Sequence, residues 1–373
     1  NQKKINMEQP FTKTKPKVLV APLDWGLGHA TRCIPIIWQL LQSGAKVILA
    51  AEGRTEVILR EEFPQLPLLT LAGYDIRYGK SKVSMMGNMM AQIPKMLMAI
   101  QEEFNWLQKT VAVYGIDLVI SDNRYGLYHT DVRSVFITHQ LLIKTPFGSI
   151  GDKALQRMNY SFINSFDECW VPDTDDAINL AGDLSHPEKP PKIPVHYIGA
   201  LSRFEFSRET GNKHLLVMLS GPEPQRSILE VKLLEQLKEY PKAVLFVRGL
   251  PGEMELPQAP MNIRIVNHLP TKELEVAIKE ASMVIGRCGY STVMDLMQLQ
   301  KRSILIPTPG QTEQEYLAAH LTAQQLAFCL MQDEFSLTNA LQSAEAIPYN
   351  LQAMHSKYLL KEAIDNLLLH VNK

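Results

Sequence analysis

The chain has 373 residues, of which 46% are hydrophobic and 21% charged; this composition is typical of a globular protein and the length is too great for one ordinary domain. A formal net charge of -1 gives no reason to expect nucleic-acid binding. The sequence contains no run of 18 apolar residues, so no membrane-spanning helix is predicted. The four cysteines are scattered without metal-ligand spacing, which favours a reduced, cytoplasmic protein.

The chain opens with a pattern that is typical of a parallel sheet. Residues 1–15 are polar and lysine-rich, and we expect a flexible lead-in there rather than a signal peptide. Residues 17–21 predict an apolar strand, residues 22–32 a loop that runs into a helix, and residues 46–50 the next strand. This β-loop-α-β order is the unit of a parallel α/β sheet.

The loop after the first strand contains a Gly-x-Gly pair, Gly26 and Gly28, which invites a comparison with dinucleotide sites. The third glycine of that fingerprint would fall at Thr31, so we do not expect NAD(P) or FAD binding. The loop carries His29 instead, and a neutral imidazole suits removal of a proton from a hydroxyl group or water. His29 could also bind substrate without proton transfer, or cap the helix. Arg32 is expected to contact a phosphate or a carboxylate.

A methionine-rich segment follows the third predicted strand, residues 66–71. Methionines and flanking lysines over 80–100 would make a soft apolar surface that accepts a lipid tail or rests on a membrane. A helix pair packed in the core or between domains explains the same pattern, with Pro94 bending or dividing it. Whether residues 85–98 meet lipid or core stays open.

Polar residues follow two further strands, residues 116–120 and residues 134–138. Ligands of open α/β sheets bind at the carboxyl ends of the strands, so we expect both loops to lie near His29. Asp122 could orient His29, act as the base itself, or close an Asx turn on its own backbone. The other candidates on this side are Asn123, Arg124, His139, as a second possible base, and Gln140.

The second half repeats the same order of strands and helices after the polar stretch 202–213, where we place the domain boundary. Strands are predicted at 214–220, 242–249, 263–269 and 327–331, and a helix at 351–371. The turn after the first of these strands offers Ser220, Gly221 and Arg226, and the third strand ends on His268 and Leu269.

Two strand-to-helix turns in this half predict an anion site. Strand 283–285 is followed by Gly289, with Ser291 and Thr292 at the helix start, where free N–H groups attract a phosphate. Arg287 could add a formal charge, and Asp295, one turn into the helix, could bind a sugar hydroxyl. The next strand, 303–306, leads through a Pro/Gly turn to Glu313 and Gln314.

These two blocks resemble the C-terminal domain of MurG-like glycosyltransferases, of the GT-B fold and the family 28 type. In that family an (S/R)-x-G-x-x-T-x-x-E block and a later acidic-Gln pair hold a UDP sugar. Residues 26–32 resemble the first loop of these enzymes and of related sugar-nucleotide hydrolases. The chain departs from the family at Asp295, where the family usually has Glu, and at 220–222, where it has one Gly instead of a Gly-Gly-Ser turn.

The resemblance implies an α/β fold of two Rossmann-like domains that face each other across a cleft. We expect residues 1–201 to form the acceptor-side domain and residues 213–349 the nucleotide-sugar domain. Residues 350–373 would be a helix that packs back onto the first domain.

The resemblance also implies an inverting, metal-independent hexosyltransferase that needs no cofactor and takes a nucleotide sugar, with UDP as the expected nucleotide. The acceptor is not identified; a lipid-linked molecule and a glycan are the alternatives. A peripheral contact with the inner face of the membrane through residues 80–100 is also left open. Alternatives are a nucleotide-sugar hydrolase, a non-hydrolysing epimerase and a non-catalytic nucleotide-sugar-binding protein. The expected catalytic residues are His29 and Asp122; the expected donor-binding residues are Gly28, Ser220, Gly221, Arg226, His268, Leu269, Arg287, Gly289, Ser291, Thr292, Asp295, Glu313 and Gln314; and the expected acceptor-side residues are Arg32, Asn123, Arg124, His139 and Gln140.

Overall fold

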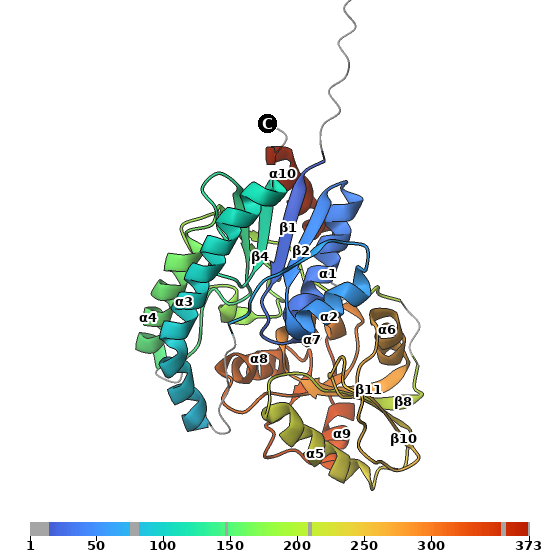
Figure 1. Ribbon diagram of the computed structural model, residues 1–373. Coiled ribbons are helices and arrows are strands. Elements are labelled where there is room, and N and C mark those ends of the chain that lie inside the picture. Colours follow the sequence, from blue (N-terminus) through green and yellow to red (C-terminus); the bar gives the residue numbers. More distant parts are fainter. Residues whose placement is uncertain (1–14, 75–81, 146–147, 208–210, 352–355, 372–373) are drawn as a thin grey trace, which may run out of the picture.

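Two parallel β-sheets, one from each half of the chain, form the framework of the protein (Figure 1). The computed structural model describes residues 15–74, 82–145, 148–207, 211–351 and 356–371, and only the backbone at 82–91 and 356. Helices cover the faces of both sheets, so the predicted α/β class is confirmed.

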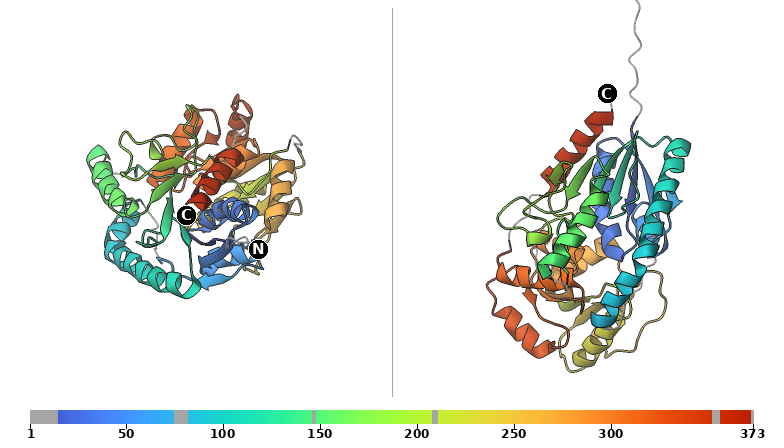
Figure 2. Two further views of the ribbon diagram at one scale, coloured as in Figure 1. Left: turned by 90° about the horizontal axis from the view of Figure 1, so that it is seen from above. Right: turned by 90° about the vertical axis from the view of Figure 1, so that its left-hand side faces the viewer.

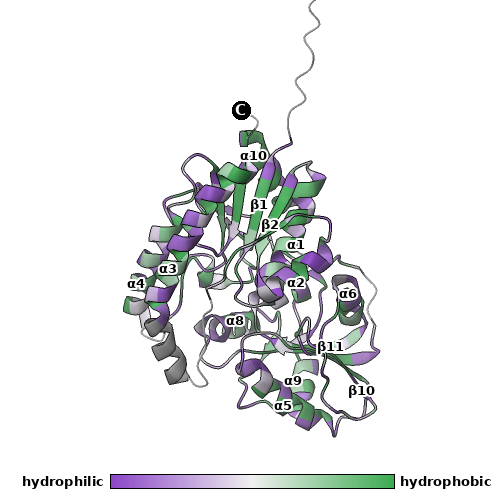
Figure 3. Ribbon diagram, in the orientation of Figure 1, coloured by the Kyte–Doolittle hydropathy of each residue, from purple (hydrophilic) through white to green (hydrophobic). Residues whose placement is uncertain are grey.

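The N-terminal sheet has seven strands in the order β3-β2-β1-β4-β5-β6-β7, and its strand pairs are parallel. Its central strands β1 and β2 are apolar after their first lysine, as expected of strands covered by helices on both faces, and this apolar part appears green in Figure 3. The strands are β1 (Lys17–Pro22), β2 (Lys46–Ala51), β3 (Leu68–Thr70), β4 (Leu118–Asp122), β5 (Arg133–Ile137), β6 (Glu168–Val171) and β7 (Val195–Tyr197).

Alternate residues of β1 pack against different helices, as the two-residue period of a strand requires. Val18 and Val20 belong to the core that includes helix α1, whereas Leu19 packs in a separate cluster with Leu107 of helix α3. The helices of this half are α1 (Leu27–Gln42), α2 (Gly53–Glu62), α3 (Lys82–Tyr114) and α4 (Gly148–Ile163), with a short 3-10 helix at Gly182–Leu184.

The C-terminal sheet has six strands in the order β10-β9-β8-β11-β12-β13, again paired in parallel. Its strands are β8 (His214–Met218), β9 (Val244–Val247), β10 (Ile263–Val266), β11 (Ala281–Arg287), β12 (Ser303–Ile306) and β13 (Phe328–Cys329). Its helices are α5 (Gln225–Leu237), α6 (Thr271–Glu280), α7 (Tyr290–Gln298), α8 (Thr312–Ala323) and α9 (Leu337–Glu345).

The last helix, α10 (Ser356–Val371), leaves the C-terminal half and lies along the N-terminal one (Figure 2). It packs against α1, and Ser43 Oγ donates a hydrogen bond to Asp365 Oδ1 at 2.9 Å. Ile364 is fully buried in this contact. Because β7 ends at Tyr197 and β8 begins at His214, we propose residues 1–201 and 213–349 as the two domains.

The structure differs from the expected elements in several places. Pro94 lies inside one helix, α3, instead of dividing two, and the side chains of the methionine-rich segment up to residue 91 lie outside the described residues, as does the expected lead-in up to residue 14. Helices α2, α4, α6 and α9 were not predicted. Helices α6 and α9 are as amphipathic as α1, so their periodic signal was present in the sequence and was overlooked, whereas that of α2 is weaker.

The sheet order brings separate loops to one edge. Pro22 at the end of β1 pairs with Asp122 at the end of β4, and Asp122 pairs in turn with Ile137 of β5. The loops that carry His29 and His139 therefore start on either side of the end of β4. No helix in the described part of the chain is both long and apolar enough to cross a bilayer.

Candidate active site

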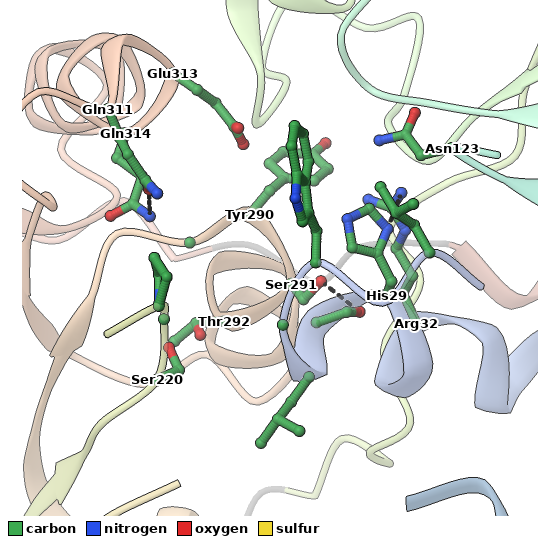
Figure 4. Close-up of a pocket in the computed structure, with 18 of the residues that line it drawn as sticks. His29, Arg32, Asn123, Ser220, Tyr290, Ser291, Thr292, Gln311, Glu313 and Gln314 are labelled. Carbon is green, nitrogen blue, oxygen red and sulfur yellow. Dashed lines mark hydrogen bonds between the residues drawn. The ribbon is translucent and has the colours of Figure 1, made fainter. Parts of the chain in front are cut away.

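A cavity of about 1440 Å³ lies between the two halves of the molecule and is lined by residues of both. Figure 4 shows His29, Arg32 and Asn123 on one side and Ser220, Gln311 and Gln314 on the other, with Tyr290 between them. Such a volume exceeds the usual upper range for one small ligand, about 1,000 Å³, so it leaves room for two reactants.

His29 lies in the first turn of α1, where the loop after β1 turns into the helix. Gly26 precedes the helix with a φ of 91°, a conformation that favours glycine, and this turn brings His29 back over the end of β4. Its Nδ1 lies 3.2 Å from Asp122 Oδ2 and 3.0 Å from Arg32 Nη2. The imidazole lines the cavity with a side chain that is 14% exposed.

Asp122 is fully buried and forms an ion pair with Arg32, which is also buried. Arg32 Nε donates to Asp122 Oδ2 at 2.8 Å, and Arg32 Nη2 lies close to Oδ1. Burial alone would raise the pKa of Asp122, but the charges of Arg32 and His29 outweigh it and hold that pKa far below its usual range. Asp122 is therefore a carboxylate that accepts hydrogen bonds and is too weak a base to take a proton itself.

Burial is the largest influence on the pKa of His29 and lowers it, and the positive charge of Arg32 lowers it further. The carboxylate of Asp122 opposes both effects without cancelling them. His29 is therefore neutral at pH 7, the form in which an imidazole accepts a proton.

The starts of α7 and α8 face His29 from the C-terminal half. Gly289 precedes α7 without a side-chain cap, so N–H groups of its first turn are free to bind a ligand. Ser291 Oγ donates to the carbonyl oxygen of Gly28 at 2.9 Å. A Cβ atom at Gly28 would lie 2.8 Å from Ser291 Oγ, so glycine lets the two halves approach this closely.

Glu313, in the first turn of α8, reaches the N-terminal half. Its Oε1 lies 2.7 Å from His139 Nε2, and Gln140 Nε2 donates to its Oε2. The His139 ring stacks on Tyr290 with centroids 4.0 Å apart, and the Tyr290 hydroxyl donates to the carbonyl oxygen of Pro172 at 2.8 Å. His139 and Gln140, predicted for the acceptor side, thus contact Glu313, predicted for the donor side.

Other residues predicted to bind the donor line the same cavity. Ser220 and Gly221 follow β8, and His268 and Leu269 follow β10. His268 Nε2 lies 2.9 Å from Glu61 Oε2 of α2. Gln314 also lines the cavity, but its Oε1 accepts the N–H of Thr308 at 2.9 Å and so stabilises the loop before α8.

Asp295 lines the cavity one helical turn after Ser291. Ser202 Oγ donates to its Oδ1 at 2.7 Å, and Arg203 Nε lies 3.9 Å from its Oδ2. Burial raises the pKa of Asp295 to about 6, against the opposing charge of Arg203.

Comparison with solved structures identifies the fold. MurG from Acinetobacter baumannii aligns with a TM-score of 0.51 at 15% identity, covering 96% of this chain and 98% of that one. A spinosyn rhamnosyltransferase, SpnG, complexed with thymidine diphosphate aligns with a TM-score of 0.58 at 15% identity, covering 95% of this chain and 96% of that one. The glycosyltransferase of kitacinnamycin aligns with a TM-score of 0.59 at 13% identity, covering 96% of each chain. These likenesses establish the two-sheet GT-B arrangement.

Comparison with known sequences indicates the class of enzyme. Two uncharacterized glycosyltransferases of Methanosarcina acetivorans are 26% identical over 323 residues and 22% identical over 328 residues, covering 80% and 81% of this chain and 79% and 82% of the relatives. Residues 235–367 match the glycosyltransferase family 28 C-terminal domain. The chain is a glycosyltransferase with the GT-B fold, similar to MurG. The predicted fold and enzyme class are thereby confirmed.

Three predicted contacts of the transferase need correction because the arginines are used inside the protein. Arg287 is buried below the cavity wall and donates to the carbonyl oxygens of Gln225, Ile306 and Pro307. These three carbonyl oxygens, from the start of α5 and the end of β12, hold the guanidinium inside the C-terminal half. Arg287 does not line the cavity and is not placed to contact a diphosphate directly.

Arg226 and Arg124 are also absent from the cavity wall. Arg226 pairs with Glu223 and Glu230 along the first turns of α5. Arg124 is fully buried; it pairs with Glu103 and donates to the carbonyl oxygen of Pro22 at 2.8 Å. A buried cation needs such partners, and each arginine finds them within its own half. Neither is placed to bind donor or acceptor.

Several apolar and aromatic side chains of the cavity wall, here called the apolar compartment, were not predicted from the sequence. They are Leu155, Met158 and Phe162 of α4, together with Tyr74 and Tyr125. The three α4 residues fall at helical spacing, and that periodicity was the available signal. Tyr290 and Arg203 also line the cavity and were not predicted.

Proposed function

We propose that this transferase moves a hexosyl group from a nucleoside diphosphate sugar, with UDP as the nucleotide, to an acceptor hydroxyl, with inversion and without a metal ion. One observation carries the proposal: a neutral His29 paired with Asp122 faces the starts of α7 and α8 across a single cavity. A base on one side and an anion site on the other suit displacement of a diphosphate at the anomeric carbon.

The donor would lie on the C-terminal half. Free N–H groups at Gly289, Ser291 and Thr292 and the positive end of the α7 dipole would bind the diphosphate, which explains how charge is stabilised without a metal. Asp295 would bind the ribose one turn further along the helix. Further donor contacts are assigned to Gly28, Ser220, Gly221, His268, Leu269, Glu313 and Gln314, which line the same cavity.

The reaction follows from this placement. The acceptor hydroxyl loses its proton to His29 Nε2, its oxygen forms a bond to the anomeric carbon, and the bond from that carbon to the diphosphate oxygen breaks with its electron pair. Attack from the His29 side, opposite the anion site, inverts the configuration at the anomeric carbon.

The mechanism requires a particular tautomer of His29. The contact of Nδ1 with Asp122 needs a proton on Nδ1, whereas the contact with Arg32 needs a lone pair there. We assign the proton to Nδ1, because Asp122 is ionised and Arg32 already donates to both oxygens of that carboxylate. Nε2 then presents its lone pair for proton transfer.

Donor choice is tested by ligand-induced stabilisation. We expect UDP and a UDP-hexose to raise the melting temperature, because a ligand present at 100 times its Kd stabilises the folded state by about 2.7 kcal/mol. TDP, GDP and ADP serve as controls for the base. Preference for TDP would correct the nucleotide, and absence of stabilisation by every diphosphate nucleotide would contradict the proposed donor site.

Transfer is separated from hydrolysis by product analysis. Incubation of the UDP-hexose alone should release little free sugar, and addition of a hydroxyl acceptor should produce a glycoside. Rapid release of free sugar without acceptor would identify a nucleotide-sugar hydrolase instead, and donor binding without any product would identify a binding protein.

The pH dependence of turnover tests the state of His29. Because burial and Arg32 lower its pKa below 6.5, we expect kcat at saturating donor and acceptor to fall at acidic pH with a midpoint below pH 6.5 and to level off as the pH rises above that midpoint. Asp295, with its pKa raised to about 6, titrates in the same region, but its protonation should raise the donor KM instead of lowering kcat. A midpoint of kcat above pH 7 would contradict the assignment of His29.

The acceptor would bind the N-terminal half, against Arg32, His139, Gln140 and the apolar compartment. Exposed Leu97 and Met98 of α3 support the proposal of a peripheral membrane contact through 80–100, where a lipid-linked acceptor could be presented. The four cysteines are free, which supports the proposed cytoplasmic location.

A further inference from the structure

Three residues other than glycine have a left-handed backbone within the described part of the chain. They are Asn123, Gln300 and Gln325, with φ angles of 59°, 49° and 58°. This conformation is unfavourable for most residues with a Cβ atom, less so for asparagine than for glutamine, and it is stabilised where a contact compensates for its cost.

Two of the three are explained by helix termination. Gln300 follows α7, and its N–H donates to the carbonyl oxygen of Met297 while the N–H of Lys301 donates to that of Leu296. Gln325 follows α8 and is placed in the same way, with Leu326 donating to Leu321. A left-handed residue at this position satisfies the last carbonyls of a helix, so local hydrogen bonds compensate for both.

Asn123 ends no helix. It follows strand β4 directly, and its N–H continues the sheet by donating to the carbonyl oxygen of Ile137 at 3.1 Å. Its side-chain Oδ1 is buried and has no hydrogen-bond partner among the described residues. The backbone N–H of Asn123 is thus satisfied by the sheet, whereas its side-chain oxygen gains no hydrogen bond within the described residues.

The position of Asn123 suggests that a bound ligand supplies the contact that compensates for its backbone conformation. Asn123 lines the cavity and follows Asp122, which holds His29. Figure 4 shows its amide group above His29 and Arg32. Unfavourable backbone conformations are found where a side chain must be held in one place for a ligand.

We propose that the Asn123 side chain binds the hydroxyl group of the acceptor and holds its oxygen toward His29. The hydroxyl would give its proton to His29 Nε2 and accept a hydrogen bond from the Asn123 amide, which leaves its remaining lone pair for the anomeric carbon. This inference rests on the proposed function, since it assigns an acceptor-binding role beside the same base.

Glycine separates the two roles of Asn123, because it adopts the left-handed backbone freely and has no amide. Asn123→Gly should raise the melting temperature by about 1–3 °C, as should the matched control variants Gln300→Gly and Gln325→Gly. Transfer to 4-methylumbelliferone, a fluorescent phenol, from the UDP-hexose should fall roughly tenfold in kcat/KM for Asn123→Gly. The two control variants should transfer within twofold of the wild type.

Two further measurements show whether the loss of transfer arises on the acceptor side. The donor Kd, measured by calorimetry with UDP, should be unchanged in Asn123→Gly, and Asn123→Asp, which keeps the size of the side chain without its N–H groups, should lose transfer to the same extent. Transfer by Asn123→Gly within twofold of an active wild type would overturn the acceptor-binding role. Absence of both UDP binding and transfer in the wild type would overturn the proposed function, and this inference with it.

Discussion

Replacement of His29 with alanine is expected to lower kcat for glycosyl transfer by about 10²–10⁴-fold, the range over which a positioned general base contributes. Donor affinity should hardly change, because the diphosphate is assigned to the starts of α7 and α8, on the other side of the cavity. The measurement is steady-state transfer together with calorimetric titration of UDP. His29→Gln, which keeps much of the size of the side chain without a basic nitrogen, should be equally slow.

A matched control for this prediction is His196→Ala. His196 lies on β7, is 51% exposed and pairs with Glu168, so its removal should leave transfer within twofold of the wild type. If His29→Ala kept more than a tenth of wild-type kcat, the base would have to be sought elsewhere, and His139 would be the next residue to test.

Replacement of Asp122 with asparagine should reduce both activity and stability. The kcat should fall by at least about 10²-fold, because asparagine can donate to Nδ1 and so stabilise the tautomer whose Nε2 carries the proton. The free energy of unfolding should fall by about 3–5 kcal/mol, because Arg32, which is 2% exposed, would be left as an uncompensated buried charge. Urea denaturation measures the second effect.

Asp117→Asn is the control for this variant. Asp117 immediately precedes β4 and accepts the backbone N–H of Lys17 at 2.8 Å, so its loss should cost little stability and no activity. The double variant of His29→Ala and Asp122→Asn should have a kcat no lower than the slower single variant, because both residues act in one proton transfer. Multiplicative losses in the double variant would mean that the two residues act independently.

Much of the C-terminal side of the cavity could be predicted because its signals are local. A buried strand, a turn and the first residues of a helix follow one another within about ten residues at both Gly289 and Glu313, and each turn lies where the spacing places it. The contact between His29 and Asp122 could also be predicted, since the carboxyl ends of neighbouring parallel strands lie at one edge of a sheet.

The direction of long side chains could not be predicted in the same way. Arg287 follows a strand beside an anion-binding turn, yet it points to backbone carbonyls of α5 and β12, which the sequence gives no means of placing. The contact of Glu313 with His139 joins residues 174 positions apart and depends on how the two halves approach. The left-handed backbone of Asn123 has no sequence signal of its own, since asparagine is common in many turns.

The path of α10 limits how this enzyme can be recombined with others. The polypeptide enters the C-terminal half after β7 and returns for its final helix, whose Ile364 is buried against the first half. A chimera that exchanges the C-terminal half must therefore be spliced at two crossover points, so that α10 is inherited together with the N-terminal half and with α1, against which it packs. A hybrid gene joined only near residue 207 would pair each half with an unrelated final helix.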